Sequence, residues 1–284
     1  ICERYCDVDG KVYLVVQFLA MACDRFRSEI LEALEKSVKP DFIYERDDAD
    51  VRNKEGLSET SGWIGKSGKT VITILENGIK LSVDIANGQK TGYFLDQKYN
   101  RKALWPIAKD HRVLDCFTHT GSFALNAAKG GAKHVTAVDV SEFAVECARR
   151  NAERNGLDGV MECVAANVFD LLPALEKEPR KYDFIILDPP AFTKSRKTIA
   201  NAMTGYKEIN YRAMRLLPRG GYLATCSCSH FATEEKFIAM LHDAARDAGV
   251  QLRQIEARQQ SCDHPILWGV EETNYLKFYL FQVV

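Results

Sequence analysis

The sequence lacks any hydrophobic run that is long enough to cross a membrane. The longest such run extends from Val12 to Cys23, is interrupted by Gln17, and falls short of the ~20 apolar residues that a transmembrane helix needs. It also lacks an excess of charge, because 38 Lys and Arg residues against 39 Asp and Glu residues leave a net charge of −1. A polyanionic partner would therefore have to be bound by a local basic patch and not by the field of the whole protein.

No CxxC pair occurs among the nine cysteines, which are odd in number and scattered along the chain. A secreted disulfide framework usually has an even number of closely spaced cysteines, so we expect reduced thiols and a cytoplasmic location. No signal-peptide pattern precedes the first strand-like segment. Because the first residue is Ile1 and not Met, we expect the natural protein to continue upstream.

The hydrophobic periodicity changes near residue 90, and 284 residues are enough for two domains. In the first part, strand-like runs at 11–18 and 42–45 flank a helical pattern at 24–39. Asn77-Gly78 between two β-branched runs predicts a hairpin, because a type I′ turn needs positive φ at both central residues. We therefore expect a small α+β domain over residues 1–88.

Over residues 89–284, strand-like and helical patterns alternate, which predicts a mostly parallel sheet covered by helices. The two last apolar runs are expected to form an antiparallel pair at one edge of this sheet. The expected strands are 112–116, 134–139, 160–164, 184–188 and 221–226; the expected helices are 122–130, 141–155 and 233–248; and the edge pair is 251–256 and 275–283.

Acidic residues close the first two of these strands, and ligands of open parallel sheets bind beyond the carboxyl ends of the strands. Asp139 is well placed to accept hydrogen bonds from ribose hydroxyls. The loop 115–123 holds a single glycine, Gly121, and no GxGxxG, so it offers few of the close backbone approaches that a pyrophosphate needs. A nucleoside cofactor without phosphates, S-adenosylmethionine, therefore fits better than a dinucleotide, with Asp115 near its amino-acid portion. The alternative is that these carboxylates only cap helices.

Asp188-Pro189-Pro190 ends the fourth strand abruptly and leaves a rigid loop with exposed carbonyls and a carboxylate. Such a loop can hydrogen-bond the edge of a flat base, with Phe192 available for stacking. A plain turn is the alternative. The basic segment 194–197 follows directly and predicts the path of an RNA backbone, against the alternative of a solvated surface.

Together these motifs resemble those of class I S-adenosylmethionine-dependent methyltransferases. More narrowly, they resemble the large-subunit ribosomal RNA cytosine carbon-5 methyltransferases (the RlmI-like group). The resemblance rests on segments 115–123, 188–192 and 227–229 and on Asp139, with further matches at 44–46, 55–57, 92–97, Arg101, 205–210 and 263–265.

The resemblance implies a Rossmann-like methyltransferase domain over residues 89–284, with S-adenosylmethionine as cofactor. It also implies 23S ribosomal RNA as substrate and partner, and no membrane partner. Whether the chain forms a homodimer is left open. Such proteins usually begin with a small RNA-binding PUA domain, which nothing here matches. We therefore expect residues 1–88 to be the substrate-side domain of a chain that is truncated at its start.

The family pattern also assigns residues to the site. The cofactor pocket would include Phe94, Asp96, Gln97, Arg101, Asp115, Phe117, Thr118, Thr120, Gly121, Ser122, Phe123, Asp139, Ser141, Asn167, Val168 and Asp188. Asn167 stands where Asp is usual, and its carbonyl can still accept a hydrogen bond from the adenine amine. The substrate would be contacted by Pro189, Pro190, Phe192 and Lys194, with Ala191 where a longer residue is common.

Carbon-5 of cytosine is not nucleophilic enough to attack a methyl sulfonium unaided, whereas a thiolate that adds to carbon-6 makes it so. We predict that Cys228, just beyond the fifth strand, is this nucleophile, and that Cys226 is packed inside the strand. Asp188 would hold the base edge and stabilise protonation at ring nitrogen 3. We expect no metal, although Cys226, Cys228 and His230 as metal ligands are the alternative, because alternate strand residues share a face.

Two other functions stay open at the level of the sequence. One is an amino-group methyltransferase that acts on adenine or guanine, which also uses an Asp-Pro-Pro loop but needs no nucleophile. The other is an RNA-binding factor that keeps the fold without turnover.

Overall fold

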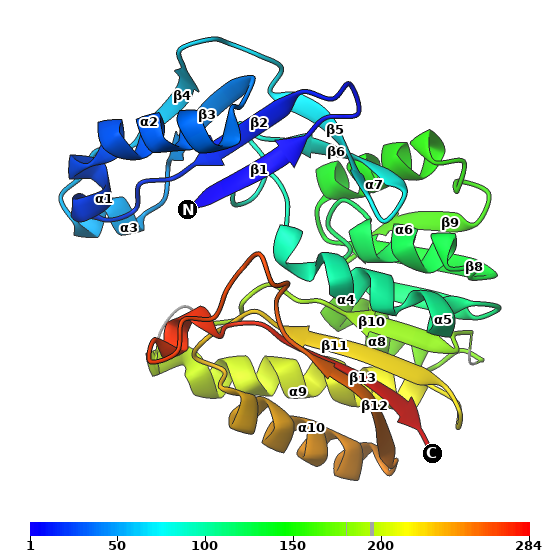
Figure 1. Ribbon diagram of the computed structural model, residues 1–284. Coiled ribbons are helices and arrows are strands. Elements are labelled where there is room, and N and C mark those ends of the chain that lie inside the picture. Colours follow the sequence, from blue (N-terminus) through cyan, green and yellow to red (C-terminus); the bar gives the residue numbers. More distant parts are fainter. Residues whose placement is uncertain (180, 194–195) are drawn as a thin grey trace. The chain divides into compact units, whose positions relative to one another are not determined.

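The computed structural model describes residues 1–179, 181–193 and 196–284, and it divides into two compact units, Ile1–Leu95 and Asp96–Val284 (Figure 1). The division falls after Leu95 and not at residue 88, because the intervening residues are tied to the first unit. The hydroxyl of Tyr5 lies 3.1 Å from Thr91 Oγ1, and the hydroxyl of Tyr93 donates to Glu76 at 3.3 Å. In the described residues, no helix is long and apolar enough to serve as a membrane span.

A four-stranded sheet of order β1-β2-β3-β4 forms the first unit, together with short helices and a separate hairpin. The core of this sheet is built by apolar residues of β2 and β3 and by Leu31 of α2. In the hairpin, Asn77 and Gly78 have φ of 52° and 74°, so the expected turn is confirmed. The elements are β1 (Cys2–Cys6), β2 (Val12–Val16), α1 (Met21–Arg25), α2 (Arg27–Val38), β3 (Phe42–Asp47), α3 (Val51–Lys54), β4 (Thr60–Ile64), β5 (Val71–Glu76) and β6 (Ile79–Asp84).

The second unit is a seven-stranded sheet of order β12-β13-β11-β10-β7-β8-β9. The five central strands that the sequence predicts are all present and parallel, and the antiparallel pair at one edge is confirmed. Its strands are β7 (Arg112–Cys116), β8 (His134–Asp139), β9 (Met161–Ala165), β10 (Phe184–Leu187), β11 (Tyr222–Ser227), β12 (Leu252–Arg258) and β13 (Lys277–Val283). The chain order reverses between β7 and β10, and this is the position where open α/β sheets bind ligands.

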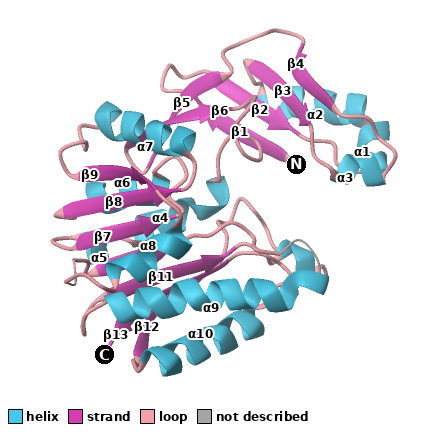
Figure 2. Cartoon of the chain, turned by 180° about the vertical axis from the view of Figure 1, so that it is seen from behind, coloured by secondary structure: helices cyan, strands magenta, loops and turns pink. Residues whose placement is uncertain are grey.

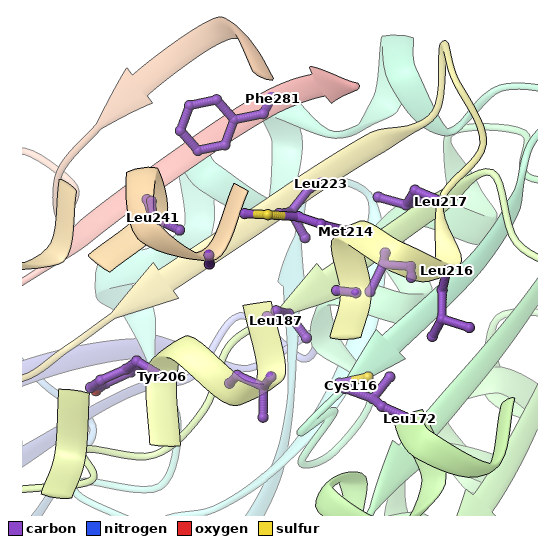
Figure 3. Packing of buried hydrophobic residues seen from close by; sticks show 14 of the residues in the cluster. Cys116, Leu172, Leu187, Tyr206, Met214, Leu216, Leu217, Leu223, Leu241 and Phe281 are labelled. Carbon is purple, nitrogen blue, oxygen red and sulfur yellow. The ribbon is translucent and has the colours of Figure 1, made fainter. Parts of the chain in front are cut away.

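Helices cover both faces of this sheet. The helices α8, α9 and α10 pack on one face, where residues such as Tyr206, Met214 and Leu241 join strand residues in a continuous buried cluster (Figures 2 and 3). The helix α6 packs against β7 and β8, and α7 against β8 and β9. The helical elements are η1 (Leu95–Gln97), α4 (Lys98–Ala103), α5 (Trp105–Ala108), α6 (Ser122–Lys129), α7 (Glu142–Arg154), α8 (Val168–Leu175), η2 (Arg196–Thr198), α9 (Ile199–Leu216), α10 (Glu234–Ala248) and η3 (Glu271–Thr273).

The first unit contains a buried ion pair. Arg52 is 3% exposed and Asp47 is 0% exposed, and Arg52 Nη1 lies 2.9 Å from Asp47 Oδ2. Arg52 also donates to the carbonyl of Ser58 and contacts Asp24 at 3.0 Å. Burial raises the pKa of Asp47 to about 6, so its charge at neutral pH depends on the guanidinium.

Replacing Arg52 by Met should therefore destabilise the first unit by about 3–5 kcal/mol at pH 7.5, because Asp47 is left buried without its cation. The loss should be smaller at pH 5, where Asp47 is protonated and needs no counter-charge. Hydrogen exchange of the β3 amides measures the effect, and the exposed neighbour variant Arg25→Met is the control, with an expected change within about 0.5 kcal/mol. Equal protection of β3 in both variants would contradict the assignment.

Candidate active site

The expected site residues meet at the carboxyl ends of the parallel strands. The register of β7, β8 and β10 brings Cys116, Val138 and Leu187 to the same level, so the loops that follow these strands leave from one edge. Three carboxylates lie at this edge, and the negative charges of Asp188 and Asp139 both act on Asp115. The edge is therefore suited to a ligand that carries positive charge and hydroxyl donors.

The loop after β7 is tightly folded. Phe117, His119 and Gly121 have φ of 64°, 51° and 86°, which lie in the left-handed region. A Cβ on Gly121 would lie 3.0 Å from both Ala148 Cβ and Met161 Cε, so only glycine lets the start of α6 approach α7 and β9 this closely. The positive φ and the close approach of α7 and β9 thus explain why the single glycine of this loop is at position 121.

Asp115 links this loop to α6. Its Oδ2 accepts hydrogen bonds from Thr118 Oγ1 at 2.6 Å and from the backbone N–H of Ala124 at 2.9 Å. Its Oδ1 is also buried, and none of the described residues offers it a hydrogen bond. Burial, together with Asp188 and Asp139, raises the pKa of Asp115 to about 7. A buried carboxylate oxygen without a partner fits the α-ammonium group of an amino-acid ligand, so the residues present suit S-adenosylmethionine. Thr120 adds a second buried oxygen, Oγ1, that has no partner among the described residues.

Asp139 closes β8 and accepts two backbone hydrogen bonds. His119 N–H donates to its Oδ2 at 2.9 Å, and Ser141 N–H donates to its Oδ1 at 3.0 Å. The cap of α7 is Ser141, whose Oγ accepts from the N–H of Ala144 at 3.2 Å. Because each carboxylate oxygen has a second lone pair, Asp139 keeps the capacity to accept from ribose hydroxyls.

Two exposed apolar side chains next to Asp139 were missed by sequence reasoning. Val140 and Phe143 are 74% and 76% exposed at the start of α7. Large apolar side chains with such exposure at a ligand-binding edge are candidates for contact with a flat base. In the sequence, these two residues are marked only by being apolar and by lying before and after Ser141, the cap residue of α7.

Asn167 caps α8, because its Oδ1 accepts from the N–H of Phe169 at 3.1 Å. The same oxygen can accept a second hydrogen bond, so its expected contact with adenine stays a prediction. Phe192 is packed among three other rings, with centroids 4.7 Å from Tyr206, 5.8 Å from Phe169 and 6.3 Å from Phe117. It therefore joins the loops after β7 and β10 to α8 and α9, and its stacking on a substrate base also stays a prediction.

A chain of hydrogen bonds reaches Asp188 from distant parts of the second unit. Gln97 Nε2 donates to Asp188 Oδ1 at 3.1 Å, and Asn100 Nδ2 donates to Gln97 Oε1 at 2.7 Å. Arg258 Nε of β12 then donates to Asn100 Oδ1 at 3.2 Å. This network fixes the Asp188 carboxylate, and sequence reasoning found Gln97 but neither Asn100 nor Arg258.

The structure also brings Asp96 and Arg101 of the junction into the second unit. Asp96 accepts from the hydroxyl of Tyr275 at 2.7 Å, and the Arg101 guanidinium lies 5.9 Å from the ring centroid of Phe123. Ser122 and Val168 are buried as well. Phe94 belongs to the first unit, so its expected role in the pocket stays a prediction.

The two cysteines at the end of β11 differ in their surroundings. Cys226 lies within the strand and is 0% exposed, and burial together with the charge of Asp188 raises its thiol pKa well above the usual range. Cys228 lies one residue beyond Ser227, the last residue of the strand, and is half-buried. The expected placement of both thiols relative to the strand end is confirmed.

Two further expected residues closely follow β10. Pro189 is buried and Pro190 is exposed, whereas Lys194 lies outside the described residues. Among the described residues, which include Cys226, Cys228 and His230, no group of three or more His, Cys, Asp or Glu side chains is placed so that it could hold a metal ion.

Replacing Asp115 by Asn tests the cofactor end of this site. Binding of S-adenosylhomocysteine should weaken by about 1.5–3 kcal/mol at pH 8, because the hydrogen bond from the ammonium to a charged group is lost. In the wild type this affinity should rise with pH through about 7, as Asp115 ionises. Titration calorimetry at pH 6 and pH 8 measures both effects.

The same variant should be more stable than the wild type at pH 8, by up to about 4 kcal/mol. The sign follows because the pKa of Asp115 is raised from 3.8 to about 7 on folding, so its ionisation opposes folding as pH rises through this range. The exposed variant Asp110→Asn, in the turn before β7, should change neither property. Wild-type affinity and stability in Asp115→Asn would remove Asp115 from the site.

The chain is similar to proteins of a known family. The family model described as S-adenosylmethionine-dependent methyltransferase matches residues 51–282. A protein of Aeromonas salmonicida named ribosomal RNA large subunit methyltransferase I is 43% identical over 93% of this chain and 67% of its own length. A protein of the same name from Erwinia tasmaniensis is 41% identical over 96% of this chain and 69% of its own length.

Solved structures show the same fold. A Streptococcus mutans structure described as a SAM-dependent methyltransferase has a TM-score of 0.82 and 25% identity, and it matches 95% of this chain and 69% of that chain. A second structure with the same scores and coverage is described as a methyltransferase complexed with SAH, the demethylated form of the cofactor. The Rossmann-like fold, the site at the carboxyl edge and these relatives lead to one conclusion. The chain belongs to the S-adenosylmethionine-dependent methyltransferase family, and S-adenosylmethionine is its cofactor.

Proposed function

We propose that this chain methylates carbon-5 of a cytosine in large-subunit (23S) ribosomal RNA, with Cys228 as the nucleophile. The names of the relatives that are 41–43% identical support a large-subunit ribosomal RNA as the substrate. The observation that supports carbon-5 chemistry is the position of Cys228, half-buried just beyond β11 at the edge that also carries Asp188. A thiol at this edge has no role in methyl transfer to an exocyclic amine.

The reaction follows from what these residues can do. The bound cofactor supplies an electrophilic methyl group. Cys228 forms a bond from sulfur to carbon-6, and the electron pair of the 5,6 double bond becomes available at carbon-5, which takes the methyl group. Asp188 accepts hydrogen bonds from the base edge and stabilises the protonated ring nitrogen 3, which draws electrons from the ring. Removal of the carbon-5 proton then breaks the carbon–sulfur bond and returns the thiolate.

The substrate contacts are part of the same proposal. Pro190 is exposed and would meet the flipped base, and Pro189 and Phe192 would fix the loop that presents the Asp188 carboxylate. Lys194 would complete the proposed contacts on the side of the RNA backbone. Methylation of an adenine or guanine amine is the second candidate, because the Asp188-Pro189-Pro190 loop suits it equally well and it needs no thiol.

Replacing Cys228 by Ala should abolish methylation of the substrate RNA but leave binding of S-adenosylmethionine intact, because the thiol acts on the base and not on the cofactor. The matched control is Cys226→Ala, which should keep turnover and lose about 1 kcal/mol of stability through a small cavity. Mass mapping of methylated nucleosides in ribosomal RNA gives the product, and calorimetry gives cofactor binding.

Trapping provides an independent readout. RNA that carries 5-fluorocytosine should form a covalent adduct with the wild type at Cys228. The hydrogen on carbon-5 is removed as a proton in the final elimination, whereas a fluorine atom cannot be removed as a cation, so the elimination is blocked. An adduct with Cys228→Ala, or full turnover of that variant, would overturn the assignment of the nucleophile. Turnover with no adduct at any cysteine would favour the amino-group reaction.

A further inference from the structure

A buried lysine lies against the loop that carries Cys228. Lys277 is the first residue of β13, is 6% exposed, and stands opposite Ser227 in the antiparallel pair of β11 and β13. Its Nζ donates to the carbonyl of Ser229 at 2.6 Å and to the carbonyl of Tyr275 at 2.8 Å. The ammonium therefore binds the residue that directly follows Cys228.

This charge is buried at a high energetic cost. Lysine is almost never fully buried unless it is paired. Within the described part of the chain, no carboxylate lies within ion-pair distance of Lys277 Nζ, which binds only carbonyl oxygens. Burial accordingly lowers the pKa of Lys277 to about 8, while the negative charges of a Cys228 thiolate and of Glu234 act in the opposite direction. A buried cation that binds the backbone directly after Cys228 calls for a functional explanation.

The loop is also held from its other side. Ser227 Oγ lies 3.1 Å from the hydroxyl of Tyr206 in α9, and the hydroxyl of Ser229 donates to the carbonyl of Thr193 at 3.2 Å. Cys228 thus stands between two fixed residues, one bound by Tyr206 and one bound by Lys277. This arrangement restricts where its sulfur can lie.

We propose that Lys277 is a positioning residue for Cys228: it holds the Ser229 carbonyl, so that the sulfur stays at the carboxyl edge, and its positive charge favours the thiolate over the thiol. The proposal rests on the proposed function in taking Cys228 as the nucleophile. The thiolate is the reactive form of cysteine, and nearby lysines are known to stabilise it. Lys277 touches neither base nor cofactor in this role and acts through Cys228.

The proposal predicts a particular dependence on pH. The groups that act on Lys277 are Cys228 after β11 and Glu234 of α10, and Glu234 also accepts from the hydroxyl of Tyr279 on β13. Tyr206 of α9 faces the same loop, and burial raises its pKa to about 12, so it stays neutral. Below pH 8 the ammonium is charged and supports the thiolate, and above pH 8 this support decreases.

Alkylation with iodoacetamide, followed by mass mapping of each cysteine peptide, measures the proposal without RNA. Cys262 is exposed in the same unit and serves as the internal reference thiol. In the wild type, the ratio of the Cys228 rate to the Cys262 rate should be highest at pH 6–7.5 and should fall above pH 8. Lys277→Met should lower this ratio about tenfold or more at pH 7, since an opposite charge at close range shifts a neighbouring ionisation by 1–3 pH units.

Rescue and control variants separate charge from packing. Lys277→Arg keeps the charge and should retain the ratio within about threefold, because a cation still lies beside the thiolate. Tyr279→Phe removes the contact with Glu234 but leaves Lys277 in place, and it should behave like the wild type. Folding of each variant is checked by circular dichroism and by binding of S-adenosylhomocysteine.

The outcomes distinguish this proposal from the proposed function. A wild-type ratio that does not change with pH would overturn the role of Lys277 even if Lys277→Met does not fold. So would a folded Lys277→Met protein with the wild-type ratio. If instead Cys228→Ala retains methylation while the ratio responds as expected, the nucleophile assignment fails and the effect of Lys277 on the thiol stands.

Discussion

The geometry of the site depends on one buried carboxylate at the end of β7. Asp115 Oδ2 joins Thr118 of the loop to Ala124 in the first turn of α6, so the loop cannot open without loss of two hydrogen bonds. Its other oxygen is left for a ligand. The same side chain therefore stabilises the backbone around it and presents a negatively charged oxygen to a cationic ligand, although burial and the two neighbouring carboxylates, Asp188 and Asp139, make its ionisation unfavourable.

Much of the second unit could be predicted from the sequence because its strands are short apolar runs that end in acidic residues. β7 and β8 have the predicted bounds, and Asp115 and Asp139 lie where their strand ends place them. The helices α8 and α9 were missed: Pro173 lies inside α8, and the N-cap residue of α9, Thr198, makes no side-chain capping hydrogen bond. The edge strands β1 and β4 were missed because their apolar residues are few.

Contacts between distant residues could not be predicted in the same way. The hydrogen bonds from Arg258 to Asn100 and from Gln97 to Asp188 join positions that are 158 and 91 residues apart, and no local pattern encodes them. The burial of Lys277 could not be predicted from the sequence either, since a lysine at the start of an apolar run is ordinarily exposed to solvent. Only the pairing of β13 with β11 shows that its side chain is enclosed.

The position of β13 also has a consequence for how the protein is made. This strand follows every other strand of its sheet in the sequence, yet it lies between β11 and β12 and not at an edge. The residues of β7, β8 and β10 are therefore synthesised well before Lys277. The contact between Lys277 and the Ser229 carbonyl can form only after all the other strands of the sheet have been made, so the surroundings of Cys228 are the last part of the site to be completed.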